Sequence, residues 1–170
     1  MRSHPGGKEH TLHLLELAGL REGDAVLDMG AGDGEAVLLM RSMGIAASGI
    51  DLEPRSPDVE QGDMLRTSFP DRCFDAVLSQ CSFFASFDQP GALREACRLL
   101  RRGGKLLLSD VFFSEPEKML RDAGFDIVCS EDMTELWLEY YLEALWRDEP
   151  PCCDIPKGKS RYFVLIGRKD

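Results

Sequence analysis

The sequence predicts an α/β protein in which helices cover both faces of a mostly parallel sheet, giving a three-layer α/β/α sandwich. Apolar runs of strand length alternate with longer segments whose apolar residues recur every three or four positions. Two of the strand-like runs end in an aspartate, and a glycine-rich turn follows the first of them. Alternating strands and helices indicate parallel pairing, because a crossover helix returns the chain to the starting edge of the sheet. The 170 residues suffice for a single domain over 1–170.

The N-terminal part supplies two helices and two strands. Gly19 lies near the end of a leucine-rich helical pattern, within an N-terminal helical segment over 1–22, and Gly44 closes a second helix. The expected elements are helices at 8–20 and 35–43 and strands at 25–29 and 45–50. Asp28 and Asp51 fall at the carboxyl ends of these two strands, where open α/β sheets bind their ligands.

The C-terminal part continues the alternation and closes with an additional strand. The expected strands are 74–80, 105–113, 125–130 and 161–169, and the expected helices are 88–102, 115–125 and 132–146. Gly103 and Gly104 stop the first of these helices, and Pro116 lies near the first turn of the second. The final strand follows a loop directly, so it can enter the sheet antiparallel at an edge.

Composition argues against polyanionic partners. The net charge is −10, whereas phosphate binding needs clustered Lys and Arg. The one basic cluster is interpreted as a solvated helix end and turn: Arg98, Arg101, Arg102 and Lys105. The N-terminus lacks the apolar core of a signal peptide, and no apolar run approaches the ~20 residues of a membrane-spanning helix. We therefore expect a cytoplasmic protein without nucleic-acid or membrane partners, whose oligomeric state stays open.

The stretch VLDMGAGDGEAVLLM places three alternating glycines between a strand and a helix. It lacks the Lys-Ser or Lys-Thr of a phosphate loop, and the dinucleotide pattern GxGxxG fails because Glu35 occupies its third glycine position. A carboxylate at the start of a helix repels a pyrophosphate. The turn therefore suits a nucleoside without phosphates, with Asp51 gripping ribose hydroxyls and Leu52 offering an apolar surface to a base. A purely structural turn is the alternative.

Five motifs in succession resemble the class I S-adenosylmethionine-dependent methyltransferases, in particular the small-molecule group related to quinone and sterol methylases. They are VLDMGAGDG, GIDLEP, QGDM, FDAVLSQCSFF and ALREACRLLRRGGKLLLSD, within residues 10–113. The resemblance implies a Rossmann-like, seven-stranded, mostly parallel sheet with an antiparallel final strand. It also implies S-adenosylmethionine as the cofactor and a small molecule as the methyl acceptor. One departure is the segment 53–61, which is too short and proline-rich for the helix that the family carries there.

The resemblance assigns cofactor contacts to individual positions. Residues matching the glycine motif are Asp28, Gly30, Ala31, Gly32 and Gly34. Asp51 matches the ribose-binding acid and Leu52 the residue that packs on adenine. Asp63 matches the acid that receives the adenine amine, with Met64 beside the ring. Ser79, Gln80 and Cys81 end the strand whose tip faces the amino-acid part of the cofactor and the acceptor.

Methyl transfer from a sulfonium needs mainly in-line positioning, so a conspicuous catalytic constellation is not required. The candidates for an acid–base role are Cys81, His10 and Tyr140. His10 and His13 share a helix face, for which a solvated surface is the favoured interpretation. Asp110 is expected to cap the loop that follows it. The segment 131–157, with Trp137, Tyr141 and Trp146, is the expected acceptor-side helix and loop.

Three other functions compete with this interpretation. Thiolates of Cys81, Cys152 and Cys153 could converge on a soft metal or metalloid, as in arsenic methylases. A non-catalytic protein that binds S-adenosylmethionine as partner or sensor would explain the lack of an evident acid–base group. A nicotinamide-dependent reductase is disfavoured by Glu35 and by the lack of a second domain. The acceptor and the methylated atom are not identified by the sequence.

Overall fold

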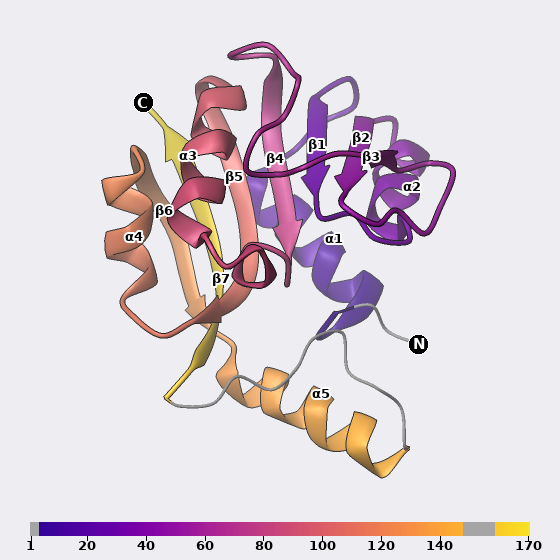
Figure 1. The fold of residues 1–170 in the computed structure, drawn as a ribbon, viewed down its shortest axis with the longest axis vertical. Helices are drawn as coiled ribbons and strands as arrows, with labels where there is room; N and C mark the ends of the chain where they lie inside the picture. The colour runs from indigo at the N-terminus through magenta and orange to yellow at the C-terminus, as the bar shows by residue number, and fades with distance from the viewer. Residues whose placement is uncertain (1–3, 148–158) are drawn as a thin grey trace.

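A seven-stranded sheet organises the chain, and its strand order places the first strand near the centre (Figure 1). The computed structural model describes residues 4–147 and 159–170. Its strands are β1 (Ala25–Met29), β2 (Ala46–Asp51), β3 (Glu60–Gln61), β4 (Phe74–Gln80), β5 (Leu100–Phe112), β6 (Phe125–Asp132) and β7 (Arg161–Lys169). The spatial order is β3-β2-β1-β4-β5-β7-β6, and only β7 pairs antiparallel to its neighbours. The predicted mostly parallel sheet with an antiparallel final strand is confirmed.

Helices cover both faces of this sheet, which confirms the three-layer arrangement. They are α1 (Gly7–Ala18), α2 (Glu35–Ser42), α3 (Gln89–Leu99), α4 (Pro116–Asp122) and α5 (Thr134–Trp146), with a short 3-10 helix η1 (Phe84–Ser86). Helices α3 and α4 lie on the near face in Figure 1, and α1 and α2 lie behind the sheet. Helix α5 extends beyond the edge where β4 and β5 end, and packs against β7.

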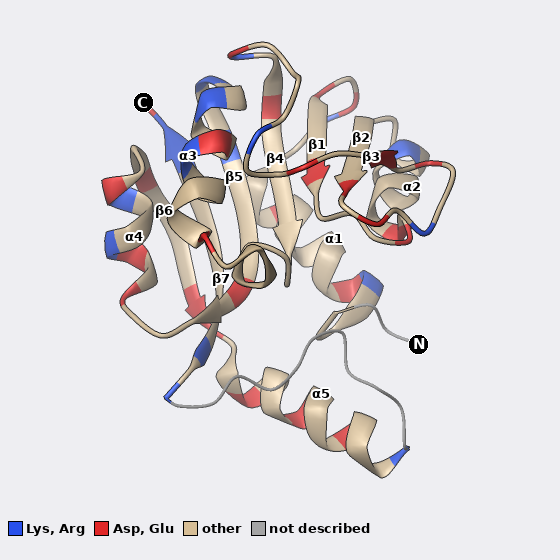
Figure 2. Ribbon diagram, in the orientation of Figure 1, with Lys and Arg blue, Asp and Glu red and all other residues tan. Residues whose placement is uncertain are grey.

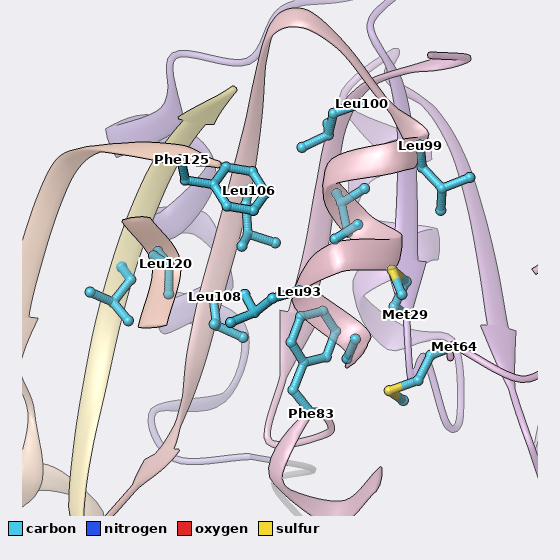
Figure 3. Packing of buried hydrophobic residues seen from close by; sticks show 14 of the residues in the cluster. Met29, Met64, Phe83, Leu93, Leu99, Leu100, Leu106, Leu108, Leu120 and Phe125 are labelled. Atoms are coloured by element: carbon cyan, nitrogen blue, oxygen red, sulfur yellow. The ribbon is translucent and has the colours of Figure 1, made fainter. Parts of the chain in front are cut away.

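Alternation along the strands divides the interior into two cores. On β5, Leu106 and Leu108 face α3 and α4, where they meet Leu93 and Leu120 (Figure 3). Leu107 points to the opposite face and joins the cluster formed by α1 and α2. Because every second side chain of a strand points the same way, one central strand supplies both cores.

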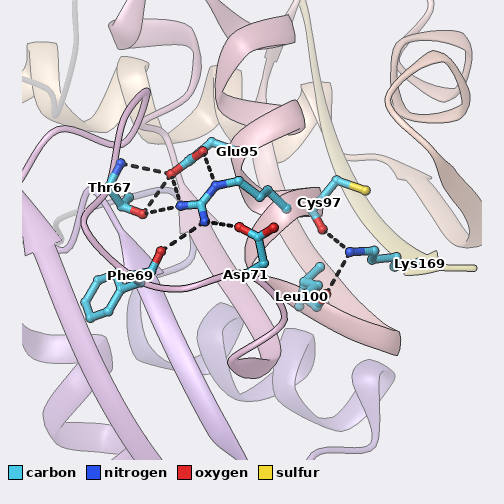
Figure 4. A network of polar contacts seen from close by, with 8 residues as sticks. Thr67, Phe69, Asp71, Glu95, Cys97, Leu100 and Lys169 are labelled. Carbon is cyan, nitrogen blue, oxygen red and sulfur yellow. Dashed lines mark hydrogen bonds and ion pairs between the residues drawn. The ribbon is translucent and has the colours of Figure 1, made fainter.

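The amino-terminal edge of the sheet is closed by ion pairs and hydrogen bonds (Figure 4). Arg98 donates to Glu95, Thr67 and Asp71, and the ion pair with Glu95 lowers the pKa of that carboxyl to about 2. Two other basic residues here are also engaged: Arg101 donates to Asp75 and Lys105 to the carbonyl of Ala18. These three side chains are therefore held by contacts within the chain.

Two boundaries differ from the sequence prediction. Helix α3 ends at Leu99 rather than before Gly103, because Leu100 is extended and pairs with Phe74 at the start of β4. This strand pairing overrides the helical pattern of residues 100–102. The segment 53–61 contains no helix and ends in the two-residue strand β3, so the predicted shortening is confirmed. Within the described residues, no helix is long and apolar enough to cross a bilayer.

Candidate active site

The carboxyl ends of β1, β2, β4 and β5 meet at one edge of the sheet, because these strands are parallel. Figure 2 shows acidic residues, in red, where β1 and β2 end. The glycine turn after β1 is fixed to β2, since the backbone N–H groups of Gly30 and Ala31 both donate to the carbonyl of Ile50, at 2.9 and 3.0 Å. Gly34 then begins α2 with a φ of 77°. The turn thus lies directly beside the end of β2.

Asp51 joins this turn to the end of β2. One carboxylate oxygen accepts a hydrogen bond from the N–H of Gly32 at 2.9 Å, and the other accepts one from the N–H of Glu53 at 2.9 Å. The side chain is only half-buried, so its remaining lone pairs are accessible at this edge of the sheet. This arrangement holds a carboxylate in a set orientation at the place where a ligand's hydroxyl groups could donate to it.

Residues 62–64 are brought to the same place by β3. The N–H of Gly62 donates to the carbonyl of Asp51 at 2.9 Å, which carries Asp63 and Met64 alongside the end of β2. Asp63 is exposed, with one oxygen accepting from the N–H of Leu65, while Met64 is buried in the core. Leu52 exposes 57% of its surface. Asp51, Leu52 and Asp63 therefore form one continuous surface.

The glycines of the turn are required by its packing. Gly30 and Gly32 have φ values of 87° and 53°, in the left-handed region that glycine adopts readily. A Cβ atom at Gly30 would overlap the side chain of Ser82, and one at Gly32 would lie 2.7 Å from the guanidinium of Arg55. Side chains at these positions would therefore disturb the turn beside Asp51.

The crevice is also rich in negative charge. Asp28 is buried beneath the turn, and burial raises the pKa of its carboxyl to about 7, with Asp51 and Asp33 adding to the rise. The raised pKa favours the neutral acid at Asp28, so the negative charge near the turn comes from Asp51 and Asp33. The half-exposed Asp51 carboxylate and the apolar surface of Leu52 together fit an adenosine.

The tip of β4 differs from the expectation in one residue. Ser79 is fully buried, and its hydroxyl donates to the carbonyl of Met29 at 2.9 Å, so its side chain lies between strands and does not reach the crevice. Gln80 does reach the crevice, where its amide oxygen accepts from the hydroxyl of Thr11 at 3.2 Å and its amide nitrogen lies 3.4 Å from Nδ1 of His4. Sequence patterns did not reveal His4 and Thr11 as part of this wall.

His10 is buried, contrary to the expected solvated surface. Gly6, with a φ of 78°, turns the N-terminal segment back so that the ring of His4 lies 6.1 Å from that of His10. Burial, followed by the neighbouring His4, lowers the pKa of His10 to about 4. His13, one turn later, is exposed and lies 3.4 Å from Glu131. Only His13 matches the surface interpretation.

Aromatic residues of α5 divide between core and surface. Trp137 and Tyr141 are buried against Tyr162 of β7, and Tyr140 is half-buried with its ring 5.6 Å from that of Tyr141. Trp146 is 88% exposed. The aromatic residues in the first part of α5 therefore pack against β7, while Trp146 at the end of the helix is exposed.

Asp110 does not cap the loop that follows it. Its carboxyl is fully buried and accepts from the N–H of Phe84 at 2.9 Å and from the N–H of Val111 at 2.8 Å. Burial raises its pKa to about 7. Asp110 thus holds η1 in place after β4, because the parallel pairing of β4 and β5 places η1 beside its side chain.

Cys81 follows β4 with a φ of 55°, and its sulfur lies 3.4 Å from the hydroxyl oxygen of Tyr162. The other two candidate thiolates, Cys152 and Cys153, lie outside the described residues. Among the residues that the structure does describe, no three His, Cys, Asp or Glu side chains are grouped to hold a metal ion. The thiolate site stays a prediction.

The fold and the glycine–aspartate contact define a nucleoside-binding α/β protein of the methyltransferase type. The family model described as a methyltransferase domain matches residues 27–108. The 27-O-demethylrifamycin SV methyltransferase of Amycolatopsis mediterranei is 31% identical, over 84% of this chain and 70% of that protein. The chain belongs to the class I S-adenosylmethionine-dependent methyltransferases.

Two further comparisons concern phosphoethanolamine N-methyltransferases. The Triticum aestivum enzyme is 26% identical over 97% of this chain but 39% of its own length, so the chain spans about two fifths of this relative. A solved structure of the Haemonchus contortus enzyme, bound to phosphomonomethylethanolamine and S-adenosylhomocysteine, has a TM-score of 0.77 at 20% identity. That match covers 98% of this chain and 54% of the other. At this identity, the structural match shows the fold alone.

Proposed function

We propose that this chain transfers a methyl group from S-adenosylmethionine to a small-molecule acceptor. The observation that carries the proposal is the 2.9 Å contact between the N–H of Gly32 and the carboxylate of Asp51. It sets a half-exposed acid beside a glycine turn at the carboxyl edge of the sheet, where a ribose could be held. Family membership supports the same cofactor.

The cofactor contacts assigned by resemblance are part of this proposal. Asp51 would accept the ribose hydroxyls, Leu52 would pack on the adenine face, and Asp63 would accept the adenine amine. Gly30, Ala31, Gly32 and Gly34 would line the methionine and ribose portions. Asp28, buried beneath the turn, would support the turn from below. Gln80, held by Thr11, would close the wall on the acceptor side.

When bound, the cofactor supplies an electrophilic methyl group on a sulfonium. The residues of this chain then have three tasks: to orient the acceptor, to exclude water and to receive a proton where the acceptor carries one. The wall formed by α5, β7 and the tip of β4 is apolar and aromatic, which suits exclusion of water.

The cytoplasmic location, the single domain over 1–170 and the exclusion of nucleic-acid and membrane partners are predictions from composition, and we retain them as part of the proposal. A metalloid acceptor would require Cys152 and Cys153 to reach Cys81. Alanine at all three positions should abolish soft-metal binding if that alternative holds, and should leave methyl transfer to organic acceptors unchanged if it does not.

The experiment that tests the proposal is a screen of metabolites with the purified protein and S-adenosylmethionine, read out as release of S-adenosylhomocysteine. Turnover with an organic acceptor is the expected result. Binding of S-adenosylhomocysteine by calorimetry without turnover on any acceptor would instead favour the non-catalytic partner or sensor. Absence of both binding and turnover would contradict the proposal.

A further inference from the structure

Three side chains from separate parts of the chain converge around Tyr162, the second residue of β7. The ring of Trp137 on α5 stacks on that of Tyr162, with centroids 6.2 Å apart and planes 10° apart. The ring of His10 on α1 lies 6.5 Å away, tilted by 46°. Cys81, after β4, contacts the Tyr162 hydroxyl. These residues, far apart in the chain, form one wall at the carboxyl edge of the sheet.

Two nitrogen atoms in this cluster are buried and unsatisfied. Nε2 of His10 and Nε1 of Trp137 have no hydrogen-bond partner among the described residues, although the two side chains expose only 5% and 2% of their surface. A buried polar atom without a partner destabilises a fold, so native proteins rarely leave one unpaired. Two of them beside one ring indicate that a ligand completes their hydrogen bonds.

We propose that this cluster binds the methyl acceptor, that the acceptor is an uncharged molecule with a hydroxyl group, and that Nε2 of His10 receives the hydroxyl proton. The inference rests on the proposed methyl transfer. Nε1 of Trp137 can only donate, so it pairs with a carbonyl, ether or hydroxyl oxygen of the same molecule. His10 is thus assigned as a catalytic residue.

The step balances without a further reactant. A lone pair of the hydroxyl oxygen forms the new C–O bond as the C–S bond of the sulfonium breaks, which leaves a neutral thioether. The hydroxyl proton passes to Nε2 of His10 and leaves to solvent with the product. Burial favours the neutral imidazole that this role needs. The other titratable groups facing His10 are His4, His13 and Glu131, and Tyr162 packs against its ring.

The described side chains around the cluster favour an uncharged acceptor over an anionic one. Its buried members are Val111, Trp137, Tyr141 and Tyr162, with Cys81, Phe84, Met133 and Tyr140 packed against them. A phosphate would find no Lys or Arg among these described side chains. Arg161, next along β7, lies 3.8 Å from Asp132 and over the ring of Phe163, so it is already engaged.

Space for an acceptor lies beside the cluster. A hollow of about 500 Å³ is lined by Asp132, Met133, Thr134, Glu135, Leu136 and Arg161. It adjoins the cluster through Met133, whose N–H donates to the carbonyl of Tyr162 at 2.8 Å. The lining of the hollow contains two carboxylates, of Asp132 and Glu135, and one guanidinium, of Arg161, so it also disfavours phosphate. An uncharged acceptor fits both surfaces.

The test is an NMR titration of the ¹⁵N-labelled full chain, with and without S-adenosylhomocysteine, using phenol, cyclohexanol and phosphoethanolamine as probes. The hydroxyl probes should shift the Nε2 signal of His10 and the Nε1–H signal of Trp137 while leaving His13 unchanged, and phosphoethanolamine should shift none of them. The proposal is wrong if phosphoethanolamine moves these signals or if neither hydroxyl probe does.

Kinetics with a hydroxyl acceptor found by the screen supply a second readout. His10→Gln keeps a hydrogen-bonding group but cannot take the proton, so kcat should fall about 100-fold or more with little change in KM. The matched control is His13→Gln on the same helix, which should stay within twofold of the wild type. Equal kcat values for His10→Gln and wild type would overturn the role of His10. If the hydroxyl probes shift the two signals but the wild type does not bind S-adenosylhomocysteine, the result counts against the proposed methyl transfer and not against the binding cluster.

Discussion

The hydroxyl oxygen of Tyr162 lies 3.4 Å from the sulfur of Cys81, so the start of β7 and the end of β4 meet across the intervening strand β5. Burial, with Cys81 as the next cause, raises the pKa of the Tyr162 phenol well above its usual value. The phenol therefore stays neutral. The N–H of Cys81 donates to the carbonyl of Ser109 at 2.8 Å, which holds the cysteine in its left-handed conformation.

The left-handed conformation of Cys81 predicts an unusual order of stabilities. The free energy of unfolding of Cys81→Gly should be about 1 kcal/mol higher than that of Cys81→Ala. Both variants lack the thiol, but only alanine strains the backbone at a φ of 55°. Urea unfolding measures the difference. Cys97, within α3, is the matched control, and there the alanine variant should be the more stable one. Finding alanine more stable than glycine at position 81 would argue against this conformation.

The packing of Gly30 predicts a larger effect than its backbone angle alone. Gly30 and Gly23 share a φ of 87°, but only Gly30 is packed against Ser82, whereas nothing lies within 4 Å of a Cβ at Gly23. Gly23→Ala should therefore destabilise by about 1–2 kcal/mol from backbone strain, and Gly30→Ala by more. Urea unfolding and calorimetry with S-adenosylhomocysteine check both variants. Gly30→Ala should also weaken binding, and equal losses in the two variants would contradict the tight contact.

The buried carboxyl of Asp110 predicts a pH-dependent contribution to stability. Its pKa in the folded chain is about 7, above that of an unfolded aspartate, so the folded state binds the extra proton between about pH 4 and pH 7. The unfolding free energy of the wild type, relative to Asp110→Asn, should fall by up to about 1.4 kcal/mol per pH unit across that window and level off above it.

Denaturant unfolding at several pH values measures this dependence. Asp126→Asn removes an exposed ion pair with Arg168 and serves as the control, with an expected change below about 1 kcal/mol. A difference between wild type and Asp110→Asn that stays constant, or that grows as the pH rises, would mean that Asp110 is ionised in the folded chain.

Local signals in the sequence were sufficient for most of the fold. Strand-length apolar runs and closing glycines located six of the seven strands, and the missing one, β3, has only two residues and no pattern of its own. The glycine turn and Asp51 were likewise recognisable, because the glycine motif directly follows β1 and Asp51 is the last residue of β2. The boundary between α3 and β5 was not, since pairing with β4 decides it.

The acceptor side depends on contacts between distant residues. The burial of His10 follows from the turn at Gly6 and from packing against Tyr162, which lies 152 positions after His10 in the sequence. Helical periodicity reveals neither contact. The burial of the Ser79 hydroxyl was also not foreseen, because alternation along β4 gives the face of a side chain but not its partner, here the carbonyl of Met29.

The most direct test of the cofactor site is calorimetric titration of S-adenosylhomocysteine into wild type, Asp51→Ala and Asp58→Ala. Asp58 forms an ion pair with Arg41 of α2, and among the described residues its carboxylate makes no hydrogen bond or ion pair with the glycine turn, so its variant controls for loss of a charge. We predict binding by the wild type and by Asp58→Ala, and a Kd at least 10-fold higher for Asp51→Ala, because a hydrogen bond to a charged group contributes about 1.5–3 kcal/mol. The account would be contradicted if the wild type did not bind S-adenosylhomocysteine at millimolar concentration, or if Asp51→Ala bound it with the same Kd as the wild type.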